Sequence, residues 1–429
     1  MGRRAVISVL VPVYNLENRI EACLAALQAS RFPDFEVLCL DDGSTDATPA
    51  LLDAAAARDP RFRVFHLPHR GVSAARNFGL DHAVGDYLTF VDGDDQLHCC
   101  FLGALLDAAR RTGAAVVELV RRGIKPSDVM TAAAFQNAVT LLASIGGSLN
   151  ALLHLPAIAS ELGLEVTWAQ VAETTSRVPL VTNITPNGDM SCVNLYKAGG
   201  IPAVMKTIER DLDTSVMTIN GKTLAENLAE DIKIDRSVIR TQDDPASVAN
   251  GIQVLYGNLA PEGTLVKTSA VPADQHTFEG PAMCFNSEEE CFAAYNADQI
   301  KPGTAVIIRY EGPKGGPGMK ELHRVTEIMK GIPGSAVITD GRFSGASGGL
   351  SVGYLCPEAA EGGPIALIQD GDIVHIDLAS NAISFDVSDE ELEARRAAWT
   401  PVVHDIKGKV LRRYLKEVGP AKDGALLGC

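Results

Sequence analysis

The sequence is short of basic residues, of closely spaced cysteines and of long apolar runs, and each shortage excludes a class of function. Its 38 Lys and Arg stand against 54 Asp and Glu, which gives a formal net charge of −16. A nucleic-acid partner is excluded, because binding a phosphate backbone requires clustered cations. Small anionic ligands remain open, since backbone N–H groups or a metal ion can hold them locally.

The nine cysteines include no Cys-x-x-Cys pair, and their number is odd. This spacing excludes a disulfide framework and a zinc finger, and it predicts reduced thiols. No apolar stretch reaches the roughly 18 residues of a membrane helix, so no membrane span is expected. The apolar run at residues 5–13 ends in PVYN instead of a small-residue cleavage site. We therefore expect a cytoplasmic protein without a signal peptide.

The 429 residues allow two or three domains, and the first 115 residues follow a clear α/β pattern. Short buried strands alternate there with helices, which predicts a mostly parallel sheet covered on both faces. The expected strands are residues 5–13, 35–40, 61–67 and 86–91, and the expected helices are residues 47–58 and 73–83.

Aspartates follow two of these strands at the point where each strand ends. DDGSTD (residues 41–46) follows the second strand, and DGDD (residues 92–95) follows the fourth. Each cluster alone is typical of a turn. Together they favour a site, because ligands of open α/β sheets bind outside the carboxyl ends of the strands. Clustered Asp oxygens suit a divalent cation on a diphosphate.

With VPVYN (residues 11–15), GVSAARN (residues 71–77) and residues 87–95, these clusters resemble the family 2 glycosyltransferases, which have a GT-A, Rossmann-like fold. The resemblance implies that Tyr14 and Asp42 hold the nucleotide base and that Arg76 lies near the sugar or phosphates. It implies that Asp92 and Asp94 bind Mn²⁺ or Mg²⁺ with a UDP-sugar.

The glycosyltransferase resemblance ends near residue 115, before the acceptor half that carries the family's carboxylate base. Without that base, glycosyl transfer loses its general-base assistance. Nucleotide-sugar binding remains as the expected activity of this segment, with residues 1–115 as its bounds.

The rest of the chain changes from helices to strands. Residues 132–145 and 150–162 are expected to be helical, with His154 and Trp168 as packed core residues. Beyond about residue 240, closely spaced short strands predict a barrel or sandwich. SDEE (residues 388–391) is a capping box that opens a last helix through Trp399. The expected strands are residues 305–309, 335–338, 350–355, 364–368, 373–378 and 382–387.

Several motifs of this part resemble the dihydroxy-acid/6-phosphogluconate dehydratase family, which includes sugar-acid dehydratases and enzymes of branched-chain amino acid biosynthesis. The resemblance implies that residues 116–240 are part of an α/β domain and that residues 241–429 form a β-barrel domain. The motifs are KPSD (125–128), GGSLN (146–150), AGGIPA (198–203), GNLAP (257–261), YEGPKGGPG (310–318), DGRFSG (340–345) and residues 357–364.

By this resemblance the chain acts on 2,3-dihydroxy or sugar acids and gives 2-keto acids, with an iron–sulfur cluster and Mg²⁺ as cofactors. Glu311 would be a magnesium ligand, and Ser344, as an alkoxide near the metal, would be the base. A serine hydroxyl needs a nearby cation to act in that way. The family's three cluster cysteines lie in an N-terminal part that this chain replaces, so the cluster ligands are expected to be missing.

Three hypotheses remain open: a catalytically incomplete dehydratase, a nucleotide-sugar binder with an unusual partner domain, and a non-catalytic chimera of two gene fragments. The families meet near residue 116 without a Pro/Gly/Ser-rich linker, although domain fusions normally join whole domains. Residues 116–240 would lack the sheet that they pack against. Exposed apolar surface is therefore expected there, and such a surface favours a homo-oligomer. A small-molecule substrate is the only other expected partner.

Overall fold

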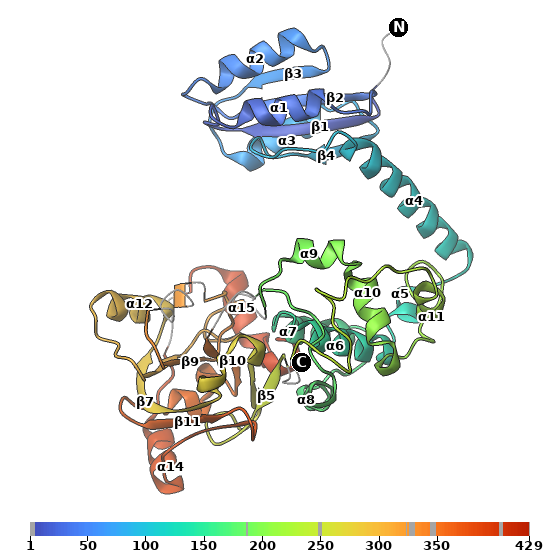
Figure 1. Cartoon of the computed structure of the whole chain (residues 1–429). Coiled ribbons are helices and arrows are strands. Elements are labelled where there is room, and N and C mark those ends of the chain that lie inside the picture. The colour runs from blue at the N-terminus through green and yellow to red at the C-terminus, as the bar shows by residue number, and fades with distance from the viewer. Residues whose placement is uncertain are drawn as a thin grey trace. The chain divides into compact units, whose positions relative to one another are not determined.

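The computed structural model describes residues 5–185, 188–247, 251–322, 324–325, 331–343, 349–402 and 406–428. The chain divides into two compact units, Met1–Gly123 and Ile124–Cys429 (Figure 1). Each unit has a hydrophobic core of its own.

The first unit is a four-stranded parallel sheet in the order β3-β2-β1-β4. Both central strands are fully buried along their length, which explains their unbroken Val- and Leu-rich sequences. The predicted α/β unit, its four strands and the helices at residues 47–58 and 73–83 are confirmed, whereas the helices at residues 20–28 and 101–121 were not predicted. The strands are β1 (Ile7–Val13), β2 (Phe35–Asp41), β3 (Phe62–His66) and β4 (Tyr87–Phe90), and the helices are α1 (Ile20–Gln28), α2 (Thr48–Arg58), α3 (Val72–His82) and α4 (Phe101–Arg121).

Helix α4 is continuous through the position where the two resemblances meet. Its 21 residues include the whole stretch from residue 110 to residue 116. Leu102 and Leu106 in its first turns are buried in the core of the first unit. Val116, Val117 and Val120, later in the helix, are 49 to 73% exposed. Part of the expected exposed apolar surface therefore lies on α4.

The second unit begins with helices. Helix α6 begins after Thr131, whose hydroxyl accepts the Ala134 N–H, and it ends at the left-handed Gly146. Trp168 is buried as predicted, whereas the prediction for His154 was wrong, because that residue lies on the exposed side of α7. The helices are α5 (Pro126–Val129), α6 (Ala132–Ile145), α7 (Ala151–Ser160), α8 (Trp168–Arg177), α9 (Cys192–Lys197), α10 (Gly200–Thr207) and α11 (Leu224–Leu228).

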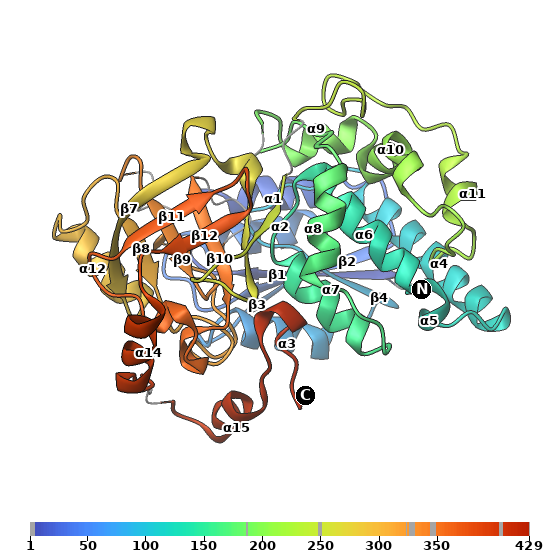
Figure 2. The same ribbon diagram turned by 90° about the horizontal axis from the view of Figure 1, so that it is seen from below.

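An eight-stranded sheet follows, in the order β12-β11-β7-β8-β9-β10-β6-β5, and it curls into a nearly closed barrel (Figure 2). A bridge between Tyr256, just after β5, and Ala382 of β12 brings its two edges together. The predicted barrel is confirmed. Its strands are β5 (Gln253–Leu255), β6 (Gly263–Val266), β7 (Thr277–Phe285), β8 (Ala305–Ile308), β9 (Ala336–Thr339), β10 (Leu350–Cys356), β11 (Ile373–Asp377) and β12 (Ala382–Phe385).

One predicted strand was wrong. Residues 364–368 begin with a 3₁₀ turn, Pro364–Ala366, instead of a strand. Helices α12 (Glu288–Asn296), α14 (Asp389–Ala398) and α15 (Lys409–Glu417) complete this unit. Among the helices of the described residues, none combines the length and apolar composition that crossing a membrane requires.

Candidate functional sites

The predicted nucleotide site is a small cavity at the carboxyl ends of the first unit's strands. The cavity has a volume of about 200 Å³. Tyr14 follows β1, Asp42 follows β2, and Asp92 and Asp94 follow β4. All four line the cavity, so four of the five residues predicted for this site come together. The remaining lining residues are Pro12, Val13, Leu16, Val72 and Gly93.

Asp42 is only 4% exposed, and it fixes the loop that leads into α3. Its carboxylate accepts the backbone N–H groups of Arg70 and Gly71, both at 2.9 Å. The ring of His69, from the same loop, stacks on Tyr14 with the ring centroids 4.3 Å apart. Tyr14 is 44% exposed. The two rings therefore form a partly open aromatic surface beside a buried carboxylate.

Arg76 does not line the cavity, but it reaches the predicted metal ligands. Its guanidinium pairs with Asp92 at 2.9 Å, and Arg19 pairs with Asp94 at 3.2 Å. The Nε atom of Arg76 is buried and has no hydrogen-bond partner among the described residues. A buried donor of this kind is costly unless another group satisfies it. An anionic ligand in this region would satisfy it.

The second predicted site lies beside β8 and β9, which are parallel neighbours whose carboxyl ends meet at one edge. The loop after β8 carries Glu311, and the loop after β9 begins with Asp340. Glu358 joins them from the segment after β10. All three carboxyl groups are at most 5% exposed.

Asp340 connects three parts of this site through one carboxylate. It accepts the backbone N–H groups of Tyr310 at 3.1 Å, Glu311 at 2.9 Å and Ala359 at 2.8 Å. Glycine is required at Gly341, since a Cβ there would lie 2.8 Å from the Cβ of Glu311. The glycines in these motifs are therefore explained in part by close packing of the loops.

Glu311 is in contact with a lysine as well as with backbone. Its Oε1 accepts the N–H of Glu288 at 2.9 Å and lies 3.4 Å from Nζ of Lys320. Burial raises the pKa of Glu311, and the Glu288 N–H and Lys320 oppose that rise. Lys320 also pairs with Glu289 at 2.9 Å.

Ser344, the predicted base, lies outside the described residues. Among the described residues of this part of the chain, one contact was not predicted from the sequence. Asn150 Oδ1 accepts hydrogen bonds from Arg342 at 3.1 Å and from the hydroxyl of Tyr354 at 2.5 Å. The motif before α7 and the loop after β9 are thereby joined across 192 residues of sequence. The only sequence signal was that Asn150 and Arg342 each stand in a family motif.

Glu358 gives the second unit a testable pH dependence. Burial, and then the nearby Asp340, raise the pKa of Glu358 from 4.5 to about 7. A carboxyl group whose pKa is higher when folded stabilises the fold fully below its unfolded pKa. That contribution is lost as the pH rises through the folded pKa.

We therefore expect the unfolding free energy to fall by about 3 kcal/mol between pH 4.5 and 7 because of this group. Glu358→Gln should flatten that fall, because its amide does not titrate. Urea unfolding of both proteins across this pH range measures the difference, and equal slopes would contradict the assignment.

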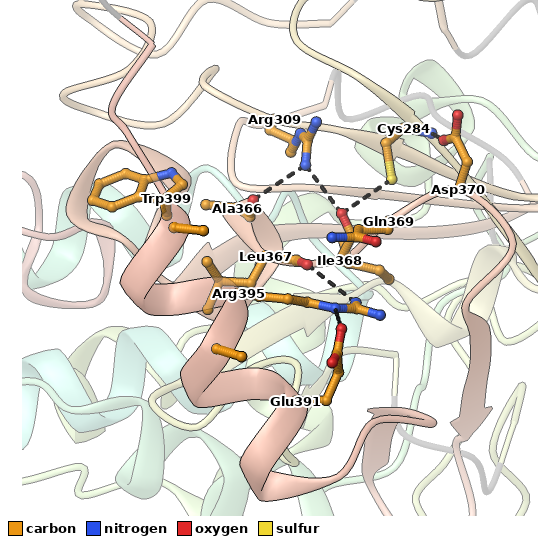
Figure 3. Close-up of a pocket in the computed structure, with 12 residues that line it drawn as sticks. Cys284, Arg309, Ala366, Leu367, Ile368, Gln369, Asp370, Glu391, Arg395 and Trp399 are labelled. Atoms are coloured by element: carbon orange, nitrogen blue, oxygen red, sulfur yellow. Dashed lines mark hydrogen bonds and ion pairs between the residues drawn. The ribbon is translucent and has the colours of Figure 1, made fainter.

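A larger cavity, of about 730 Å³, lies between α14 and residues 364–370 (Figure 3). Arg309 enters it and donates to the carbonyls of Ala366 and Ile368. Arg395, on the other wall, pairs with Asp372 and Glu391. None of the predicted site residues lines this cavity, so it is separate from both candidate sites.

Three family models match successive stretches of the chain, two of which overlap. Glycosyl transferase family 2 matches residues 8–138. The N-terminal and C-terminal models of the dihydroxy-acid/6-phosphogluconate dehydratases match residues 103–227 and 237–425. One stretch of the chain thus matches a glycosyltransferase model, and a later stretch matches two dehydratase models; we call them the glycosyltransferase segment and the dehydratase segment. The two matches overlap over residues 103–138.

Relatives of the dehydratase segment cover most of this chain. The dihydroxy-acid dehydratase of Moorella thermoacetica is 45% identical over 330 residues, which are 76% of this chain and 60% of that protein. The enzyme of Clostridium kluyveri is 45% identical over 324 residues, covering 74% and 58%. The chain thus spans about 60% of the length of these relatives.

Two solved structures are similar to part of the chain. Staphylococcus aureus TarS 1-349 in complex with UDP-GlcNAc is 35% identical, covering 26% of this chain and 31% of that chain, with a TM-score of 0.22. The mannosyltransferase PcManGT from Pyrobaculum calidifontis, in complex with GDP-Man and Mn²⁺, is 30% identical. It covers 23% of this chain and 30% of that chain, also with a TM-score of 0.22.

Proposed function

We propose that this chain is a protein of the dehydratase (hydro-lyase) family whose site for 2,3-dihydroxy or sugar acids is catalytically incomplete. The observation that carries the proposal is the position of Glu311 and Asp340. Both lie at one edge of the barrel, inside the segment that matches the family. The reaction class is loss of water from a dihydroxy acid to give a 2-keto acid. Its base would be Ser344.

The iron–sulfur cluster of the family does not fit the cysteines that the structure describes. A cluster needs three or four converging thiolates. Cys23 and Cys39 are buried in the first unit. Within the described residues, a single group of three His, Cys, Asp or Glu ligands is close enough for one metal ion, and it contains only two cysteines. No step of the reaction is therefore assigned to a cluster.

Magnesium fits the described residues only in part. Glu311 supplies one carboxylate, but it is not part of any described group of three ligands. Its Oε1 already contacts the Glu288 N–H and Lys320. Mg²⁺ is normally held by one or two carboxylates, with waters completing its octahedral shell, and Glu311 supplies at most one of these ligands. No step is assigned to Mg²⁺, and the incompleteness of the site follows from the missing cluster ligands.

We expect anaerobically purified chain to hold far less than one cluster and to form no 2-keto acid from 2,3-dihydroxy acids. Iron, acid-labile sulfide and keto acid, measured on the same preparation with a complete dehydratase as control, test this. One cluster per chain together with turnover that Ser344→Ala abolishes would overturn the incompleteness. It would leave the reaction class in place. The molar mass of the same preparation, measured by light scattering, tests the predicted homo-oligomer.

A second function is favoured by the cavity at Asp42, Asp92 and Asp94. We propose that it binds a nucleotide sugar of the UDP type, with Mn²⁺ or Mg²⁺ held by Asp92 and Asp94. Two carboxylates suffice for such an ion when a diphosphate supplies further oxygens. The ion would neutralise the diphosphate charge. The aromatic surface of Tyr14 suits the flat face of a base, and Arg76 suits the anionic part.

A further inference from the structure

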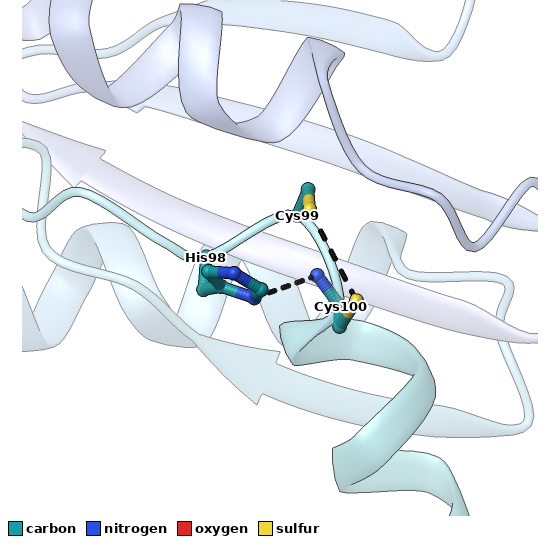
Figure 4. Close-up of side chains that lie close together, drawn as sticks. All are labelled: His98, Cys99 and Cys100. Carbon is teal, nitrogen blue, oxygen red and sulfur yellow. Dashed lines mark hydrogen bonds between the residues drawn. The ribbon is translucent and has the colours of Figure 1, made fainter.

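A second group of potential metal ligands lies between β4 and α4, in a segment that neither proposed function uses. His98, Cys99 and Cys100 are consecutive, and their ligand atoms all lie within 4.8 Å of one another (Figure 4). His98 and Cys100 are exposed, and Cys99 is half-buried. A metal ion in solvent can therefore reach the group without opening the fold.

The separation of the two sulfurs matches that of two ligands on one ion. The Sγ atoms of Cys99 and Cys100 are 4.0 Å apart. Two thiolates bound to a tetrahedral Zn²⁺ at about 2.3 Å stand roughly 3.8 Å from each other. A disulfide would need about 2.05 Å, half of the separation here. The pair is therefore close to the spacing of a metal-bound state.

The backbone around the group is held in place from both sides. The Arg31 N–H donates to the Cys99 carbonyl at 2.8 Å, and the Phe101 N–H donates to the His98 carbonyl at 2.8 Å. Nδ1 of His98 faces the Cys100 N–H at 3.3 Å, a long contact that a metal ion can replace. Three potential ligands are thus presented by a short, tethered segment.

A guanidinium group and a helix N-terminus lie beside Cys100. Nη1 of Arg31 lies 3.9 Å from its sulfur. Cys100 is also the residue that precedes the first turn of α4, where the helix dipole favours negative charge. Cysteine binds metal ions as the thiolate.

We propose that His98, Cys99 and Cys100 bind one thiophilic metal ion of the Zn²⁺ type. The fourth position would be left to water or to a ligand from outside the segment. The ligand set separates this site from the one at Asp92 and Asp94. Thiolate and imidazole select zinc-like ions, whereas carboxylates suit Mg²⁺ and Mn²⁺. With two sulfurs, the group is too small for an iron–sulfur cluster.

Titration of the reduced, tag-free chain with Cd²⁺ tests the site, because the ultraviolet thiolate-to-cadmium absorption does not report carboxylates. We expect one ion per chain and loss of the absorption in the Cys99→Ser/Cys100→Ser variant. Cys192→Ser removes an exposed cysteine of the second unit and should change nothing. His98→Ala should weaken Zn²⁺ binding by more than the roughly tenfold cost of losing an outer-sphere partner.

Three results would overturn the proposal: no thiolate absorption in the native sequence, absorption that persists in the double variant, or a His98→Ala affinity equal to that of the native sequence. The third result would mean that only the two cysteines bind the metal ion, without His98. Circular dichroism of each variant checks that the fold is intact. The result does not depend on nucleotide binding, which can succeed or fail separately.

Discussion

Replacing Asp94 with alanine should abolish Mn²⁺-dependent binding of UDP, with a loss of at least about 100-fold, or roughly 3 kcal/mol. Asp94 lines the cavity, and the whole chain carries a net charge of −16. This negative charge repels a diphosphate unless a bound cation bridges the diphosphate and the protein. Removing one of two carboxylate ligands removes that connection. Isothermal titration with UDP in Mn²⁺, repeated in EDTA, measures both the loss and its metal dependence.

Asp107→Ala is the matched control for Asp94→Ala. Asp107 is an aspartate of the same unit, 71% exposed on α4 and outside the cavity. Its substitution removes the same charge without touching the site, so UDP binding should be unchanged. If Asp94→Ala bound UDP as tightly as this control in Mn²⁺, the metal-binding role of Asp94 would be wrong. If neither variant nor the native chain bound UDP, the nucleotide function itself would fail.

Asp340→Ala should destabilise the second unit by about 3 kcal/mol or more. The carboxylate is fully buried, and its loss leaves three backbone N–H groups without an acceptor. Each buried, unsatisfied donor costs about 1–3 kcal/mol. The chain's two tryptophans, Trp168 and Trp399, both belong to this unit. Tryptophan fluorescence during urea unfolding therefore reports the stability of this unit.

Asp377→Ala is the control for that experiment, because it removes the same negative charge from an exposed position instead of a buried one. Asp377 accepts the Ala379 N–H and the Ser380 hydroxyl in an exposed turn of the same unit. Solvent can replace its contacts, so a loss of less than about 1 kcal/mol is expected. Equal losses in the two variants would mean that Asp340 does not hold the site together in the way its hydrogen bonds indicate.

The four strands of the first unit were predictable because their signals are local. A strand buried on both faces reads as an unbroken apolar run, as in β1 and β2. The aspartates that follow β2 and β4 then lie at one edge as a consequence of parallel topology. The three aspartates of the cavity could therefore be named from the sequence pattern, whereas Tyr14 was named only through the family resemblance.

The barrel was predictable as a class but not strand by strand. Strand β7 contains Gly280 and Pro281, residues that argue against a strand, and it was not predicted. The apolar residues 364–368 lacked any feature that separates a short strand from a 3₁₀ turn. The hydrogen bonds of Asn150 with Arg342 and Tyr354 join distant segments, and no local pattern encodes such a meeting.

Helix α4 has a consequence for how such a gene arises. Each backbone hydrogen bond of a helix joins residues four positions apart. When two sequences are fused inside a helix, the sequence before the fusion point therefore does not determine which residues the sequence after it must pair with. A strand cut at its middle would lose its neighbours' register at once. Leu102 and Leu106 anchor the start of α4 in the first core, and nothing in the helix beyond them has to match that core. Recombination inside a long helix can therefore join two unrelated reading frames and still yield continuous secondary structure.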